Sequence, residues 1–127
     1  MSRGPQYDNN MYYHSKWKSV VNVMTHSNLD IAKIAQAGSR TKQRQRLDSD
    51  MDVIFSVVGN PSKRDFYPIL ISILQGNFQY DRVYPGGNYN VVHLDFASGG
   101  KFDLVLLSSV AFDAEYNQNL EYRKKNL

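Results

Sequence analysis

The stretch that decides the fold is residues 36–58, QAGSRTKQRQRLDSDMDVIFSVV. A Gly-Ser pair stands near its start, a run of basic residues follows, and three aspartates come just before an apolar run. The apolar run, 53–58, is β-branched and almost continuous, which predicts a strand that is buried on both faces. Asp50 and Asp52 stand at the head of that strand, where alternation directs both side chains to the same face. Acidic groups therefore gather at the mouth of a buried strand.

This acidic pair is a candidate metal site. Two neighbouring carboxylates repel each other unless a cation lies between them or one of them is protonated, and Mg²⁺ prefers oxygen ligands of this kind. The alternative is a solvated acidic turn, because a bare Asp-X-Asp is common by accident. Upstream, the turn at Gly38 and Ser39 offers backbone N–H groups and a hydroxyl that can hold phosphate oxygens. Opposite a carboxylate-bound Mg²⁺, that turn would hold the other end of a triphosphate.

The rest of the chain predicts an α/β (α+β) domain, with a mixed β-sheet and flanking helices. Segment 29–37 is ambiguous, because its alanines favour a helix although it is short. We expect a flexible arm over 1–10 and a single domain over 11–127. The other expected elements, from apolar periodicity and turn residues, are helices at 11–24, 61–76 and 112–125, and strands at 82–84, 89–96 and 101–107.

Composition narrows the function classes. The chain of 127 residues contains no cysteine, which excludes disulfides, thiolate metal sites and cysteine nucleophiles. The net charge of +3 suits a polyanionic partner, although many proteins without such a partner share it. No signal peptide is evident and no apolar run reaches the ~20 residues that a membrane span needs. We therefore expect a cytoplasmic protein with no membrane partner.

The spacing of these motifs resembles the nucleotidyltransferase superfamily of the DNA polymerase β type. Members of that superfamily carry Gly-Gly or Gly-Ser, about a dozen variable residues, and then acid-apolar-acid-apolar; SDMDV, residues 49–53, looks like the SDxD form of its small members. A third acid on a later strand completes the triad, and Asp103 in KFDLVLL matches it. The hairpin that ends in this strand is similar to that of the oligoadenylate synthetase and cyclic-dinucleotide synthase branch, although Leu106 and Leu107 stand where that branch often has Pro-Ala. The resemblance covers residues 29–107 and implies that the ambiguous segment before Gly38 is a strand.

The resemblance also implies roles for the acids. Asp50, Asp52 and Asp103 would be the catalytic residues and the ligands of two Mg²⁺ ions, with Mn²⁺ as an alternative, and Asp103 would be the nearest group to take the proton of the attacking hydroxyl. A purely structural aspartate at 103 would cost several kcal/mol unless it were paired. Asp95, in VVHLDF, is the rival third acid, and His93 on the same strand face is interpreted as a structural or surface residue.

For the nucleotide, the resemblance implies contacts with the triphosphate from Gly38 and Ser39, with Arg40 as the best placed basic residue. The basic residues that follow would contact phosphates or an RNA acceptor, or would simply belong to a solvated loop: Lys42, Arg44 and Arg46.

The expected function is transfer of a nucleoside monophosphate from a nucleoside triphosphate to a hydroxyl of RNA, a nucleotide or a protein. Larger polymerising members of this superfamily carry a helical second domain, for which the chain after Asp103 is too short. We therefore expect a helical partner chain or self-association to complete the site. The alternative is a catalytically silent domain of the same fold that binds RNA, nucleotide or a protein partner, because fold does not imply activity.

Overall fold

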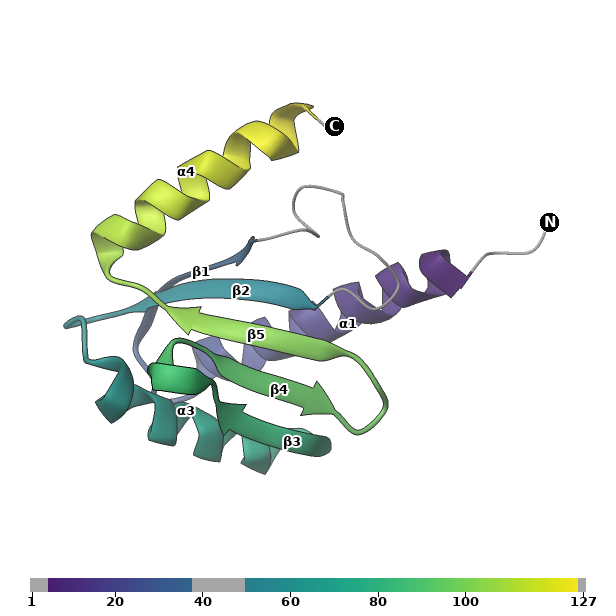
Figure 1. The fold of residues 1–127 in the computed structure, drawn as a ribbon, viewed down its shortest axis with the longest axis horizontal. Helices are drawn as coiled ribbons and strands as arrows, with labels where there is room; N and C mark the ends of the chain where they lie inside the picture. Colours follow the sequence, from purple (N-terminus) through teal and green to yellow (C-terminus); the bar gives the residue numbers. More distant parts are fainter. Residues whose placement is uncertain (1–4, 38–49, 126–127) are drawn as a thin grey trace.

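The computed structural model of the protein describes residues 5–37 and 50–125. Within these ranges, the chain forms helices and the strands of one sheet (Figure 1). In order, they are α1 (Pro5–His26), β1 (Ile31–Ala37), β2 (Met51–Val57), α3 (Lys63–Asn77), β3 (Tyr80–Pro85), the short 3₁₀ helix η1 (Gly87–Tyr89), β4 (Val92–Phe96), β5 (Lys101–Leu106) and α4 (Ser109–Lys125).

The strands form one five-stranded mixed sheet in the order β1-β2-β5-β4-β3. The β2–β5 pair is parallel, and the β1–β2, β4–β5 and β3–β4 pairs are antiparallel. This arrangement confirms the mixed sheet expected from the sequence. The nearly continuous apolar run of β2 explains its internal position, because a strand flanked on both sides and covered on both faces needs apolar residues at successive positions.

One face of the sheet carries most of the core. Helices α1 and α3 cover this face with residues such as Val20, Met24, Leu70 and Leu74, all of them fully buried. The sheet contributes alternate residues of its three inner strands, namely Val53, Phe55 and Val57 of β2, Phe102, Leu104 and Leu106 of β5, and Val92, Leu94 and Phe96 of β4. The intervening residues of these strands must therefore point to the opposite face.

The opposite face is covered only in part. Helix α4 leaves the end of β5 and runs back above β1 and β2 (Figure 1). A small second cluster forms there from Ala35, Ala37, Ile54 and Phe112. The ion pair between Lys33 of β1 and Asp113 of α4, at 2.7 Å, ties the helix to the edge strand. The apolar cover of this face therefore ends near β1 and β2, and polar side chains occupy the strands beyond it.

The ambiguous segment is a strand, β1, as the resemblance implied. Its register with β2 runs from Ile31 opposite Val57 to Ala37 opposite Asp52. Ile34 packs toward the main core while Ala35 and Ala37 pack toward α4. Pairing with β2 and packing on both faces of the strand together outweigh the preference of alanine for a helix.

The helices begin at other residues than expected, and α4 begins at Ser109 rather than at residue 112. Helix α1 begins at Pro5 rather than at residue 11, so the expected flexible arm over 1–10 is helical from residue 5. Proline suits a first helical position, where its missing N–H would have no partner. Helix α3 begins at Lys63, because the Ser62 hydroxyl caps it by accepting a hydrogen bond from the Asp65 N–H at 3.2 Å.

A buried tyrosine joins α3 to the sheet. The Tyr67 hydroxyl donates to the Asn90 carbonyl and accepts from the Leu106 N–H, both at 3.1 Å, and the side chain is fully buried. We expect Tyr67→Phe to lower the free energy of unfolding by about 1–3 kcal/mol, because a buried donor and acceptor lose their partner. Urea denaturation measures the change. Tyr80→Phe is the matched control at an exposed tyrosine; equal effects of the two substitutions would contradict the role assigned to this hydroxyl.

Candidate active site

A polar row crosses the partly open face of the sheet. Asp52 of β2 is the register partner of Asp103 of β5, Asp103 is the partner of His93 of β4, and His93 is the partner of Tyr84 of β3. Because directly opposed residues on neighbouring strands lie on the same face, these four side chains form one line across four strands. The line begins beside the end of β1, where Ala37 lies opposite Asp52.

A second polar row runs alongside the first. Asp50 immediately precedes Met51, whose register partner is Phe102, so Asp50 lies near Lys101. Lys101 is the partner of Asp95, and the guanidinium of Arg82 lies 3.6 Å from the Asp95 carboxylate. Charges alternate in this row, whereas the first row begins with two adjacent carboxylates.

Three carboxylates face one another where the two rows begin. The pKa of Asp52 is raised from 3.8 to about 6. Burial is the largest cause, and the nearby charges of Asp103 and Asp50 add to it. Burial likewise raises the pKa of Asp50 to about 6, with contributions from the charge of Asp103 and from a side-chain hydrogen bond with it, against which Lys101 acts. Neighbouring carboxylates that repel one another form a site that favours added positive charge.

The structure places Asp103, and not Asp95, beside the acidic pair. Asp103 lies directly opposite Asp52, and its charge is one of the causes that raise the pKa of Asp50. Asp95 lies on the next strand, is engaged by Arg82, and is the weakest of the charges that act on Asp50. The geometry therefore favours Asp103 over Asp95 as the third acid, while the catalytic roles of the three aspartates stay predictions.

The side chains fit a hard metal ion by their chemistry, since carboxylate oxygens are the donors that Mg²⁺ takes. Within residues 5–37 and 50–125, however, no three carboxylate or imidazole groups already lie close enough together to enclose an ion. The predicted phosphate and acceptor contacts lie outside the described residues, namely Gly38, Ser39, Arg40, Lys42, Arg44 and Arg46.

Sequence reasoning missed the connection between His93 and the acids. The imidazole Nδ1 lies 2.7 Å from Oδ1 of Asp103, and the ring packs against Tyr84 with centroids 4.8 Å apart. The alternation of β4 indicates that His93 shares a face with Asp95, but it does not say which residue of β5 lies opposite. The register of the β4–β5 hairpin was the missing information.

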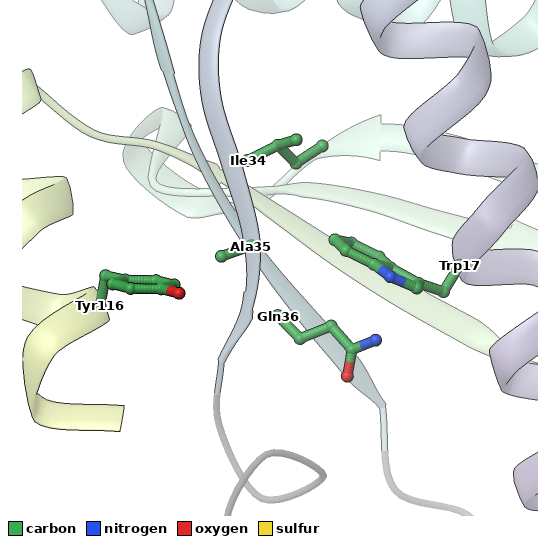
Figure 2. Close-up of a pocket in the computed structure, with 5 residues that line it drawn as sticks. All are labelled: Trp17, Ile34, Ala35, Gln36 and Tyr116. Atoms are coloured by element: carbon green, nitrogen blue, oxygen red, sulfur yellow. The ribbon is translucent and has the colours of Figure 1, made fainter. Parts of the chain in front are cut away.

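A separate hollow of about 350 Å³ lies beside β1, the edge strand of the sheet. Figure 2 shows the ring of Trp17, from α1, on one side of the strand and the ring of Tyr116, from α4, on the other. Ile34, Ala35 and Gln36 complete the lining. This lining contains no carboxylate, imidazole or amine. None of the helices in the described part of the chain has both the length and the apolar character to cross a bilayer.

The chain is similar to known proteins in its structure and not in its sequence. No protein-family model matches the chain, and no curated protein matches it by sequence. Solved structures do match. GLD-2 in its complex with RNP-8 superposes with a TM-score of 0.67 at 12% identity, over 91% of this chain and 37% of that one. The Cid1 poly(U) polymerase, solved with Mg and 3′-dATP, gives a TM-score of 0.65 at 10% identity over 86% of this chain and 34% of that one.

A bacterial enzyme matches as well. The CD-NTase CdnG of Bradyrhizobium diazoefficiens, in complex with GTP, gives a TM-score of 0.58 at 15% identity over 84% of this chain and 33% of that one. The chain thus spans about a third of the length of each of these three proteins. Together with the mixed sheet and the acids on β2 and β5, these superpositions show that the chain has the nucleotidyltransferase fold of the DNA polymerase β type.

Proposed function

We propose that this chain is a Mg²⁺-dependent nucleotidyltransferase that moves a nucleoside monophosphate from a nucleoside triphosphate to a hydroxyl acceptor. The observation that carries the proposal is the meeting of Asp50, Asp52 and Asp103 on the partly open face of this fold. Asp50 and Asp52 both have raised pKa values that burial and neighbouring carboxylates explain. A site of this kind gains most when a divalent ion neutralises the repulsion, which a purely structural cluster would not need.

In this proposal the three aspartates hold the metal. Asp50, Asp52 and Asp103 would hold two Mg²⁺ ions, with Mn²⁺ as the alternative metal. Such ions would supply a lowered pKa for the attacking hydroxyl and stabilisation of the charge that develops on the leaving pyrophosphate. The carboxylate of Asp103 is the group of the described chain best placed to accept the hydroxyl proton, because it lies on the same face in direct register with Asp52.

The triphosphate is assigned to the residues that follow β1. Ala37 lies opposite Asp52 in the sheet, and Gly38, Ser39 and Arg40 come directly after it in the sequence. Backbone N–H groups and the serine hydroxyl would bind phosphate oxygens there. The three basic residues further along, Lys42, Arg44 and Arg46, would contact phosphates or the acceptor.

The acceptor and partners are proposed from the comparisons. One matched structure contains GTP and another contains Mg with 3′-dATP, which supports a nucleoside triphosphate as the donor substrate. GLD-2 was solved in a complex with RNP-8, which supports a partner for this chain as well. We assign the acceptor to RNA, a nucleotide or a protein, place the reaction in the cytoplasm, and expect a helical partner chain or a second copy at the site.

Calorimetric titration of ATP, GTP, CTP and UTP, with and without Mg²⁺, tests the proposal. We expect the wild type to bind at least one triphosphate only when Mg²⁺ is present, and Asp50→Ala/Asp52→Ala to lose that binding, because the metal no longer has its ligands. Asp81→Ala is the matched control, since Asp81 is an exposed aspartate of β3. It should bind like the wild type.

The outcomes separate the two functions that the fold allows. Metal-dependent binding that disappears in the double variant supports the transferase. Equal binding by the wild type and the double variant would contradict it and would favour a catalytically silent domain that binds nucleotide or a partner without using the acids.

A further inference from the structure

We infer that His93 is a positioning residue for Asp103: its imidazole holds one carboxylate oxygen of the third acid and so orients the other toward the metal and the acceptor hydroxyl. This inference rests on the proposed function. It concerns a residue to which the sequence motif assigns no role.

The contact itself is short and sheltered. The Nδ1–H of His93 donates to Oδ1 of Asp103 across 2.7 Å. The two side chains are 28% and 20% exposed, so solvent reaches the pair only in part. A hydrogen bond to a charged acceptor in such surroundings is shorter and roughly twice as strong as one between neutral groups. Oδ2 of Asp103 is then the oxygen left free of the imidazole.

The histidine is itself held in place. The ring of Tyr84 packs against the imidazole with centroids 4.8 Å apart and planes at 33°. The Arg82 guanidinium lies 4.7 Å from the centroid of the Tyr84 ring. On the Nε2 side the backbone of Gly86 approaches so closely that a Cβ there would lie 3.1 Å from Nε2. A ring confined in this way can fix the rotamer of its acceptor, as partners of metal ligands do in metal sites.

A purely structural role explains the contact less well. Residues 93 and 103 are already register partners in the antiparallel β4–β5 pair, so backbone hydrogen bonds hold these strands without help from the imidazole. The contacts also form one continuous series, from Arg82 to Tyr84, from Tyr84 to His93, and from His93 to the proposed metal-binding acids. A series of contacts that ends at the Asp103 carboxylate is the arrangement expected of residues that position this side chain.

The test uses two substitutions at one position. His93→Phe keeps a ring against Tyr84 but removes the donor, whereas His93→Asn keeps an N–H donor at the place of Nδ1. The matched control is His14→Phe, because His14 is an exposed residue of α1 on the opposite side of the sheet. Mn²⁺ affinity in the presence of the triphosphate that binds best is measured by electron paramagnetic resonance. Turnover is measured as pyrophosphate release, with and without a short oligoadenylate as acceptor.

We expect His93→Phe to weaken Mn²⁺ binding and to lower kcat by about 10- to 100-fold each, the range that loss of a partner of a metal ligand usually produces. KM for the triphosphate should change little, because the phosphate contacts are elsewhere. His93→Asn should recover most of both losses, and His14→Phe should behave as the wild type.

A readout that needs no activity accompanies these measurements. In protein labelled with ¹⁵N-histidine, the Nδ1–H proton of His93 should give a downfield, slowly exchanging resonance that disappears in Asp103→Ala. Wild-type Mn²⁺ affinity and kcat in His93→Phe, while Asp52→Asn abolishes both, would overturn the inference and leave the proposed function standing. Absence of metal-dependent triphosphate binding in the wild type is instead the failure of the proposed function, and a missing Nδ1–H resonance overturns the inference whatever the activity.

Discussion

Replacing Asp52 or Asp103 by asparagine is expected to lower the rate of nucleotidyl transfer at least about a thousand-fold. The two residues are register partners on β2 and β5, and each substitution removes one charged oxygen from the proposed metal site. Metal ions supply several kcal/mol of transition-state stabilisation in such reactions, and each 1.36 kcal/mol is a factor of ten in rate. Pyrophosphate release from the triphosphate that binds best, in saturating Mg²⁺, measures the loss.

Two other aspartates serve as controls. Asp81→Asn removes a charge from an exposed position of β3 and should leave the rate unchanged. Asp95→Asn removes the rival third acid, which is engaged by Arg82 at 3.6 Å, and should lower the rate only a few-fold. A large loss in Asp95→Asn together with an active Asp103→Asn would show that the third acid has been assigned to the wrong strand.

The same substitution at Asp52 is expected to stabilise the metal-free protein. The folded-state pKa of Asp52 is raised to about 6, by burial first and then by the charges of Asp103 and Asp50. Because a raised carboxyl pKa means that the folded state binds protons more tightly than the unfolded state, stability is lost as pH rises from about 4 to about 6. Above about pH 6 the ionised carboxylate of Asp52 lowers the stability of the fold by the full amount. Asparagine carries no charge and has no such effect.

Melting temperatures from pH 5 to pH 8 in the presence of a chelator measure this effect. We expect Asp52→Asn to melt above the wild type at pH 7 and above, by about 3 to 5 °C for each ~1 kcal/mol relieved, with the difference shrinking toward pH 5. Added Mg²⁺ should raise the melting temperature of the wild type at neutral pH and should have little effect on the variant. A variant that melts below the wild type at pH 8 without metal would mean that the ionised Asp52 stabilises the fold, contrary to the repulsion inferred here.

According to these two predictions, the acidic site is needed for activity and lowers the stability of the metal-free protein. The inactive variant should be the more stable protein without metal, and the active protein should recover stability when an ion binds. A surface acidic cluster would behave differently, because its charges are solvated and their removal changes stability little.

Much of the fold and part of the site could be predicted from the sequence, for identifiable reasons. The run at 53–57 is apolar except for Ser56, as an internal strand covered on both faces requires, whereas Val58 lies beyond β2 and is exposed. The alternation at its head places Asp50 and Asp52 on one face whatever the tertiary structure is. Asp103, between apolar neighbours in KFDLVLL, is marked by the cost of burying an unpaired charge.

Local preference was a poorer guide where burial or caps decide. The alanines of β1 favour a helix, but pairing with β2 makes them a strand that is packed on both faces. The cap at Ser62 sets the start of α3, and several residues near that start could have served as well.

The chemistry of the strands can be read from the sequence alone: an apolar run to be buried, and carboxylates spaced to share a face. Which residues of different strands meet depends on the tertiary structure. The parallel register of β2 with β5 brings Asp103 opposite Asp52, and the register of the hairpin brings His93 opposite Asp103 while it directs Asp95 to Arg82. The physical reason is that side-chain alternation is a property of each strand alone, whereas register between strands depends on backbone hydrogen bonds and turn geometry that distant residues settle together.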